Sequence, residues 1–95
     1  MTVTDEPGIY VAGEFGVRIE NTLLIVPYMQ TDFGQFLTFE PLTLCPIDTR
    51  PLLVSLLSDD ERKWLNNYHE VVRERLAPDL EGEELAWLEQ ATQAI

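Results

Sequence analysis

The sequence predicts an α+β protein in which a strand-rich amino-terminal part is followed by two helices. Residues 1–44 contain alternating and continuously apolar runs bounded by turn-forming residues, as short antiparallel strands do. Residues 58–77 begin with a Ser-Asp-Asp-Glu start signal and then carry apolar side chains at helical spacing. A second helical pattern follows Pro78, a residue that ends the first helix.

A hairpin is expected near the amino terminus. Residues 2–4 form a short strand, and Pro7-Gly8 is a turn signal. Two further strands flank a tight reversal at residues 11–15. Because side chains alternate between the two faces of a strand, Arg18 and Glu20 share one face.

The two strands of this hairpin each deliver one carboxylate, Glu6 and Glu20. Two carboxylates and the Arg18 guanidinium on one face are costly unless a positive group, such as a metal ion, lies among them. The segment therefore suggests a metal site. Arg18 has two interpretations: a simple salt-bridge partner of a neighbouring carboxylate, or a residue that orients Glu20.

The remaining strands follow in order. Residues 15–29 are predicted as the longest strand, and within it residues 22–26 are continuously apolar, as in a strand covered on both faces. Residues 30–35 are polar and form a loop. Residues 36–44 form a further strand. Pro46 and Pro51 bracket an irregular segment.

The two helices are predicted from their start signals and apolar stripes. Ser58 and Glu61 match a capping box at the start of the first helix. Its apolar stripe consists of Trp64, Leu65, Tyr68, Val71, Val72 and Leu76. The second helix is expected at residues 83–94. Its stripe consists of Leu85, Leu88, Thr92 and Ile95, with Trp87, Ala91 and Ala94 beside it.

Some single residues invite a chemical interpretation but favour a structural one. Cys45 lies in an apolar run with no neighbouring base, so a buried, inert thiol is expected rather than a nucleophile. His69 borders a helical stripe, and a structural role is expected for it. Tyr10 is interpreted as a packing residue in preference to a wall of the site. Trp64 and Trp87 are interpreted as packing or interface residues.

Composition excludes several classes of function. The 95 residues carry a formal net charge of -11, which repels phosphate backbones and anionic membranes. Neither nucleic acid nor a membrane is therefore an expected partner. The single cysteine permits no internal disulfide, and the amino terminus does not resemble a signal peptide. The longest apolar run, residues 23–26, is far too short to span a membrane, so a cytoplasmic location is expected.

Several motifs follow one another in a distinctive order. They are Glu6-Pro7-Gly8-Ile9-Tyr10, Gly16-Val17-Arg18-Ile19-Glu20-Asn21, Phe36 to Asp48 with Phe39-Glu40-Pro41-Leu42-Thr43, Trp64-Leu65-Asn66-Asn67-Tyr68-His69, and Trp87 to Thr92. In this order and spacing they resemble the metal-dependent Xaa-Pro aminopeptidases, also called aminopeptidase P, of the M24 pita-bread metallopeptidases. The resemblance covers nearly the whole chain.

The resemblance implies a fold and a metal site. Residues 1–44 would be the carboxy-terminal strands of the pita-bread antiparallel sheet, and residues 45–95 a helical carboxy-terminal extension. The family binds two divalent ions, usually manganese, through two aspartates, one histidine and two glutamates. Glu6 matches a terminal metal ligand that is also the proposed general base, and Glu20 matches the carboxylate that bridges both ions. Arg18 matches an arginine beside this site.

The chain departs from the family at its amino-terminal side. The family's two aspartates and histidine lie upstream of the Glu-Pro-Gly motif, and only five residues precede Glu6 here. The resemblance thus implies the carboxy-terminal part of a hydrolase that removes the amino-terminal residue before a proline. The chain alone is not expected to be active.

Two other functions stay open. One is a non-catalytic binding or dimerisation module, since relatives with this extension form homodimers. The other is a metal-free relative such as a creatine-hydrolase-like enzyme, against which the extension argues.

Overall fold

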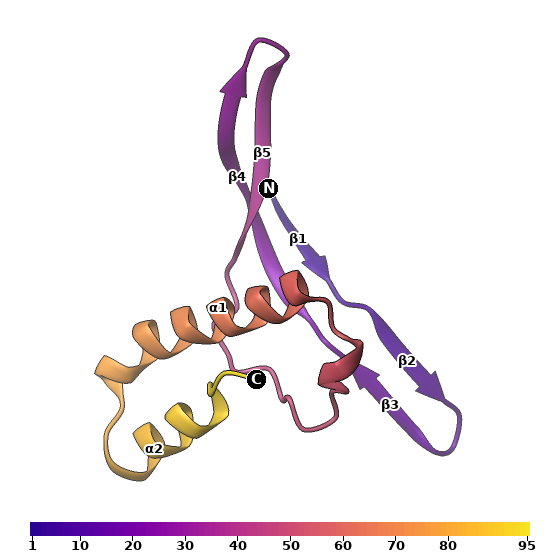
Figure 1. Cartoon of the computed structure of the whole chain (residues 1–95), viewed down its shortest axis with the longest axis vertical. Coiled ribbons are helices and arrows are strands. Elements are labelled where there is room, and N and C mark those ends of the chain that lie inside the picture. Colours follow the sequence, from indigo (N-terminus) through magenta and orange to yellow (C-terminus); the bar gives the residue numbers. More distant parts are fainter. The chain divides into compact units, whose positions relative to one another are not determined.

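The computed structural model describes residues 1–95, which divide into two compact units, Met1–Thr43 and Leu44–Ile95. The first unit contains all the strands, and the second contains the helices (Figure 1). This arrangement confirms the α+β prediction. No helix of the structure combines the length and the apolar character needed to cross a membrane.

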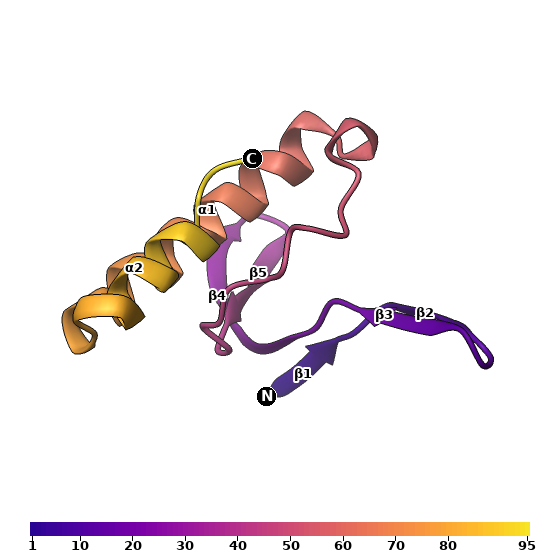
Figure 2. The same cartoon turned by 90° about the horizontal axis from the view of Figure 1, so that it is seen from below.

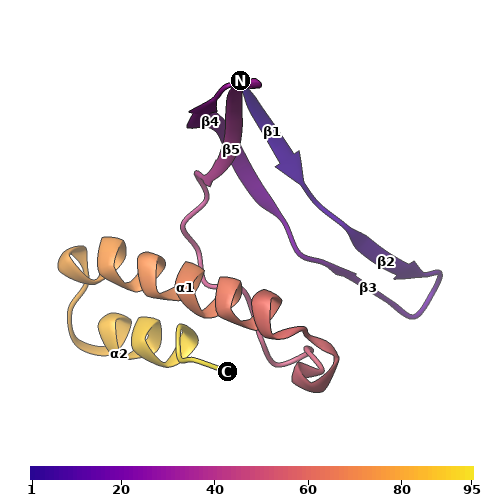
Figure 3. The ribbon, with the colours of Figure 1, turned by 45° about the horizontal axis from the view of Figure 1, so that its top comes forward.

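The strand unit consists of two small antiparallel sheets. Its strands are β1 (Thr2–Asp5), β2 (Gly8–Val11), β3 (Phe15–Arg18), β4 (Asn21–Thr31) and β5 (Gly34–Pro41). One sheet has the order β1-β4-β5, and β2 and β3 form the other. Figure 3 shows that β2 and β3 continue the course of β1 and β4. The expected hairpin at residues 11–15 is present.

Proline accounts for the break between the two sheets. The Ile19 N–H donates to the Pro7 carbonyl at 3.3 Å, which is one half of a bonded antiparallel pair. Proline has no N–H, so the return hydrogen bond to Ile19 cannot form. The strand predicted at residues 15–29 is therefore interrupted, and Pro7-Gly8 breaks a ladder rather than making a turn.

The two hairpins turn at glycines with positive φ. In the first, Gly13 has a φ of 74°, and the Glu14 N–H donates to the Val11 carbonyl at 3.0 Å. In the second, Gly34 has a φ of 127° and pairs with Thr31. Such angles favour glycine because it lacks a Cβ. The loop expected at residues 30–35 is thus only a short turn at residues 32–33.

The strand unit has no apolar core of its own. Residues 22–26 are only half-buried, so the expectation of a strand covered on both faces is wrong for this chain. Apolar residues gather on one face of the β4–β5 ladder instead: Leu23, Ile25, Pro27, Leu37, Phe39 and Pro41. Of these, Leu37 is 60% exposed and Phe39 59% exposed.

The helical unit has a small, well-defined core. Its main helices are α1 (Asp59–Leu76) and α2 (Gly82–Ala91), with 3-10 turns at Val54–Leu56 and Ala77–Asp79. In Figure 2, α2 runs back along α1. The buried core residues are Leu65, Tyr68, Val72 and Leu88, with the partly buried residues Leu44, Ile47, Leu52, Leu76, Ala77, Leu80 and Ile95 packed against them.

The helical stripes are narrower than the sequence predicts. In α1, Trp64 is 51% exposed and Val71 is 43% exposed. Trp87 of α2 is 59% exposed, whereas Leu88 and Thr92 are buried. Trp64 stacks on Tyr68 with ring centroids 5.4 Å apart, so it covers the rim of the core rather than its centre. Packing between two helices alone cannot bury their full apolar width.

Two aromatic side chains of α1 hold the preceding loop. The Tyr68 hydroxyl donates to the Cys45 carbonyl at 2.8 Å, and the Ile47 N–H donates to His69 Nε2 at 3.0 Å. These bonds satisfy backbone groups of a segment without regular structure. Cys45 itself is exposed, so the expectation of a buried thiol is wrong. The loop places its backbone, not its sulfur, against the helix.

The carboxy terminus is held by hydrogen bonds to α1. The Asn66 side chain donates to the Ile95 carbonyl at 3.2 Å and accepts from the Ile95 N–H at 2.9 Å. Arg73 Nη1 donates to the Thr92 carbonyl at 3.0 Å, and the Thr92 hydroxyl donates to the Leu88 carbonyl at 2.7 Å. These contacts provide hydrogen-bond partners for backbone groups at and beyond the carboxy-terminal end of α2.

The capping box of α1 is present as predicted. The Ser58 Oγ accepts from the Glu61 N–H at 3.1 Å, and the Ser58 N–H donates to Glu61 Oε2 at 2.8 Å. Replacing Ser58 by alanine should lower the free energy of unfolding of the helical unit by about 1 kcal/mol. Urea denaturation followed by tryptophan fluorescence measures it. Ser55→Ala is the matched control, and an equal loss in both variants would contradict the cap assignment.

Candidate metal centre

The strand registers bring the two predicted carboxylates opposite each other. Asp5 pairs with Asn21 at the end of the β1–β4 ladder, and Gly8 pairs with Arg18 at the start of the β2–β3 ladder. Glu6 follows Asp5, and Glu20 precedes Asn21. The same antiparallel register therefore places Glu6 opposite Glu20. The two side chains therefore emerge at the break between the sheets, where Pro7 interrupts the ladder.

The type of pairing at this point draws the carboxylates together. Pro7 and Ile19 form the bonded position of the ladder, through the 3.3 Å hydrogen bond described above. Bonded and non-bonded pairs alternate in antiparallel strands, so Glu6 and Glu20 occupy a non-bonded pair. In such pairs the Cβ atoms lie about 4.5–5.5 Å apart. Two carboxylates on side chains that start this close together favour a cation between them.

Arg18 partly neutralises this acidic pair. Its Nη2 lies 2.9 Å from Glu20 Oε2, and both side chains are partly exposed. The negative charge of Glu20 raises the pKa of Arg18, as do a hydrogen bond with the Tyr10 side chain and the charge of Glu6. The structure confirms that Arg18 is a salt-bridge partner of Glu20. That Arg18 also orients Glu20 stays a prediction.

Tyr10 is the residue of this site that sequence reasoning misjudged. It is 66% exposed, so it does not pack in a core. A Cβ added to Gly8 would lie 2.7 Å from the Tyr10 hydroxyl, and one added to Gly16 would lie 2.8 Å from Tyr10 Cδ1. The ring therefore lies flat across two glycines and directs its hydroxyl toward Arg18. The sequence signal for this arrangement of the ring is a glycine two residues before the tyrosine (Gly8) and a second glycine opposite it in the hairpin (Gly16).

The donor set suits a hard divalent cation but is incomplete. Carboxylate oxygens are the ligands that manganese and magnesium prefer. The chain contains no group of three or more histidine, cysteine, aspartate or glutamate side chains able to hold a metal ion. Asp5 occupies the opposite face of its strand from Glu6. His69 Nε2 already accepts the Ile47 N–H. Glu6 and Glu20 thus fit as two ligands of a larger set.

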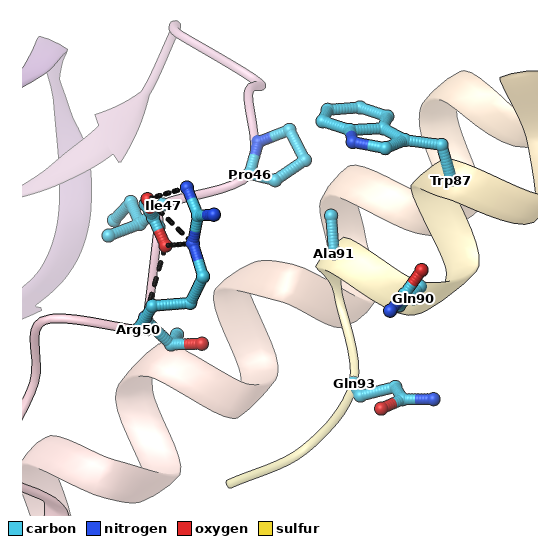
Figure 4. Close-up of a pocket in the computed structure, with 9 residues that line it drawn as sticks. Pro46, Ile47, Arg50, Trp87, Gln90, Ala91 and Gln93 are labelled. Atoms are coloured by element: carbon cyan, nitrogen blue, oxygen red, sulfur yellow. Dashed lines mark hydrogen bonds and ion pairs between the residues drawn. The ribbon is translucent and has the colours of Figure 1, made fainter.

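A separate pocket in the helical unit has one ion pair in its lining. It has a volume of about 510 Å³, and Trp87 of α2 and Pro46 of the loop are among the residues that line it (Figure 4). Its charged residues neutralise each other, because Arg50 Nη2 lies 2.6 Å from Asp48 Oδ2. Hydrogen bonds from Arg50 lower the pKa of Asp48 to about 2. Asp48 is therefore ionised near neutral pH, and its low pKa makes it only a weak base.

The sequence of this chain matches a known protein family. Residues 35–95 match a family described as the C-terminal region of peptidase M24. The matched part includes β5 except its first residue, Gly34, and the whole helical unit. The two glutamates lie amino-terminal to it.

Whole-chain relatives extend the match to the glutamates. A probable Xaa-Pro aminopeptidase P of Coprinopsis cinerea is 40% identical over 100 residues, covering 100% of this chain and 16% of the relative. A probable Xaa-Pro aminopeptidase P of Arthroderma benhamiae is 46% identical over 99 residues, covering 98% of this chain and 14% of the relative. This chain therefore spans only a small part of the curated relatives that it matches.

A solved structure shares the fold. The X-prolyl aminopeptidase of Caenorhabditis elegans, described as a cytosolic enzyme with a di-nuclear active site, superimposes with a TM-score of 0.88 and 39% identity. The match covers 99% of this chain and 16% of that one. Motif order, family match and fold agree: the chain belongs to the M24 peptidase family and corresponds to the carboxy-terminal part of an Xaa-Pro aminopeptidase.

Proposed function

We propose that the chain supplies two metal ligands, Glu6 and Glu20, to a dinuclear Xaa-Pro aminopeptidase site. The observation that carries the proposal is the placement of these carboxylates opposite each other at the gap between two ladders. The 2.9 Å contact from Arg18 leaves the second oxygen of Glu20 available for a cation. The di-nuclear active site of the Caenorhabditis elegans enzyme supports a pair of ions.

The chemistry follows from the positions of these side chains. Bound divalent ions, for which we propose manganese, lower the pKa of a water at the site toward neutrality. When those ions are bound, Glu6 would act as the general base toward that water, and Glu20 would be the carboxylate ligand that the two ions share. Arg18 keeps Glu20 in one orientation, and the Tyr10 hydroxyl steadies Arg18 in turn.

The names of the relatives suggest the substrate. We propose a peptide with proline in its second position, from which the first residue is removed. We propose that the remaining ligands come from polypeptide outside residues 1–95 and that the chain alone is inactive on such peptides. The description of the solved relative as cytosolic favours a cytoplasmic location.

Manganese binding to the isolated chain tests the site directly. We expect weak binding, because two carboxylates form only part of a shell. Paramagnetic broadening of NMR signals by Mn²⁺ should centre on Glu6 and Glu20, and Glu20→Gln should remove most of it. Glu14→Gln, in the exposed first turn, is the matched control. Broadening that persists in both the Glu6→Gln and the Glu20→Gln variants would show that these two residues are not the metal ligands.

Activity of the complete enzyme provides the second test. In a full-length aminopeptidase carrying this sequence, Glu6→Gln should lower kcat by roughly 10²–10⁴-fold, the usual contribution of a general base. Glu14→Gln should leave kcat unchanged. Release of the amino-terminal residue from an Xaa-Pro peptide measures both. Full activity of the Glu6→Gln enzyme would reject the general-base role.

A homodimer formed through the helical unit is a second candidate function. Leu53, Leu56, Trp64 and Trp87 of this unit are 69%, 77%, 51% and 59% exposed. Large exposed side chains of this kind mark protein–protein contacts. Sedimentation of the chain should then show a dimer that Trp64→Ala weakens. A strictly monomeric chain at high concentration would contradict the proposal.

A further inference from the structure

Asn21 is the only residue of the strand unit that is buried. It is 7% exposed, whereas the apolar residues that follow it on β4 are only half-buried. Burying an amide costs free energy unless its hydrogen bonds are satisfied. The strand unit leaves its apolar residues partly exposed but buries Asn21. The buried amide therefore serves to position the strand rather than to add hydrophobic stability.

The Asn21 amide is held by the hydroxyl of Thr43, two residues beyond the end of β5. Asn21 Nδ2 donates to Thr43 Oγ1 at 3.1 Å, and the Thr22 backbone N–H donates to the same oxygen at 3.2 Å. The Leu42 N–H donates to the Thr22 carbonyl at 2.8 Å, which extends the β4–β5 ladder to this point. One hydroxyl thus receives both donors from the first two residues of β4.

The position of Asn21 connects this contact to both carboxylates. On one side Asn21 is clamped by Thr43, and on the other it pairs with Asp5 of β1. Glu6 directly follows Asp5, the last residue of β1, and Glu20 directly precedes Asn21, the first residue of β4. A one-residue slip of β4 would carry Glu20 to the other face and away from Glu6. A buried polar residue is a known means of fixing register.

We propose that Asn21 and Thr43 are positioning residues that lock the register in which Glu20 faces Glu6. The inference rests on the proposed metal-binding role of these two glutamates. Asn21 acts from the face of β4 opposite to Glu20, because neighbouring residues of a strand alternate between faces. It therefore sets the separation of the carboxylates without contacting the ion.

The test removes only the hydroxyl. Thr43→Val keeps the shape of the side chain, and Thr43→Ser restores the hydroxyl. Thr38→Val is the control, at an exposed threonine of β5. The first readout is the Hα–Hα NOE between Glu6 and Glu20, which is strong in a non-bonded antiparallel pair. The second is the Mn²⁺ concentration that broadens the Glu6 and Glu20 signals.

The expected results separate the proposal from general destabilisation. Thr43→Val should weaken or abolish the NOE and raise the required Mn²⁺ concentration about tenfold, the usual effect of losing a group that orients a ligand. Thr43→Ser should restore both, and Thr38→Val should change neither. An unchanged NOE and unchanged Mn²⁺ affinity in Thr43→Val would overturn the proposal.

Two further outcomes are decisive. If the unaltered chain shows the NOE but no Mn²⁺ effect, the metal assignment fails, and the NOE in the variants alone decides the positioning role. If Thr43→Val does not fold, hydrogen exchange in the unaltered chain decides. A protected Thr22 amide and a slowly exchanging Asn21 side-chain amide support the clamp, and rapid exchange of both refutes it.

Discussion

Leu88→Ala is expected to unfold α2 from the helical unit or to destabilise the whole unit by about 2–5 kcal/mol. Leu88 is completely buried and is the only residue of α2 in the buried core, where Leu65, Tyr68 and Val72 of α1 surround it. Truncation removes the contacts that hold α2 and leaves a cavity that two helices cannot easily close. Few contacts elsewhere compensate in so small a core.

Tryptophan fluorescence during urea denaturation measures this loss. Both tryptophans, Trp64 and Trp87, lie in the helical unit, so the signal reports that unit alone. Leu53→Ala is the control, because Leu53 is 69% exposed and should change stability by no more than about 0.5 kcal/mol. Equal midpoints for the Leu88→Ala variant and the unaltered chain would show that α2 does not depend on this contact.

Acid should destabilise the same unit through His69. The imidazole is completely buried, its Nε2 accepts the Ile47 N–H, and its Nδ1 has no hydrogen-bond partner. Burial lowers the pKa of His69, and the positive charge of Arg73 lowers it further. The hydrogen bond from Ile47 requires an unprotonated Nε2, so protonation both breaks that bond and buries a charge.

The sign of the pH dependence follows from this lowered pKa. The unfolded chain takes up a proton near pH 6.5, whereas the folded chain does so only at lower pH, so stability is complete above pH 6.5. It then falls with decreasing pH, by up to about 1.4 kcal/mol per pH unit, until the pH reaches the folded pKa. His69 is the only histidine, so no other imidazole contributes.

His69→Gln isolates this contribution. Glutamine offers an acceptor for the Ile47 N–H but does not titrate, so the His69→Gln variant should lose the slope that begins as the pH falls below 6.5. Urea midpoints across this range, followed by tryptophan fluorescence, supply the comparison. A His69→Gln variant that keeps the full slope would assign the acid sensitivity to carboxylates instead.

Local signals explain the elements that were predicted correctly. The Ser58–Glu61 capping box, the hairpin reversal at residues 11–15 and the helix ending near Pro78 each depend on residues close in sequence. Their hydrogen bonds and backbone angles form within one turn, so a short window contains the necessary information. The ordered motifs carrying Glu6 and Glu20 likewise lie in the sequence itself, so they indicate the family without the structure.

Properties that depend on distant partners required the tertiary structure. Cys45 is exposed because its backbone, rather than its thiol, faces Tyr68. Trp87 is exposed because α2 packs through Leu88. An apolar pattern shows which residues favour burial, but the geometry of the partner decides which of them achieve it.

The candidate site depends both on local sequence patterns and on tertiary packing. The sequence alone determined that two carboxylates and an arginine lie on neighbouring strands, because alternation within a strand is a local property. Only the tertiary structure decided that Glu6 faces Glu20, that Tyr10 covers two glycines, and that Asn21 is buried. Register between strands depends on hydrogen bonds formed across the sheet, and no single segment encodes those bonds.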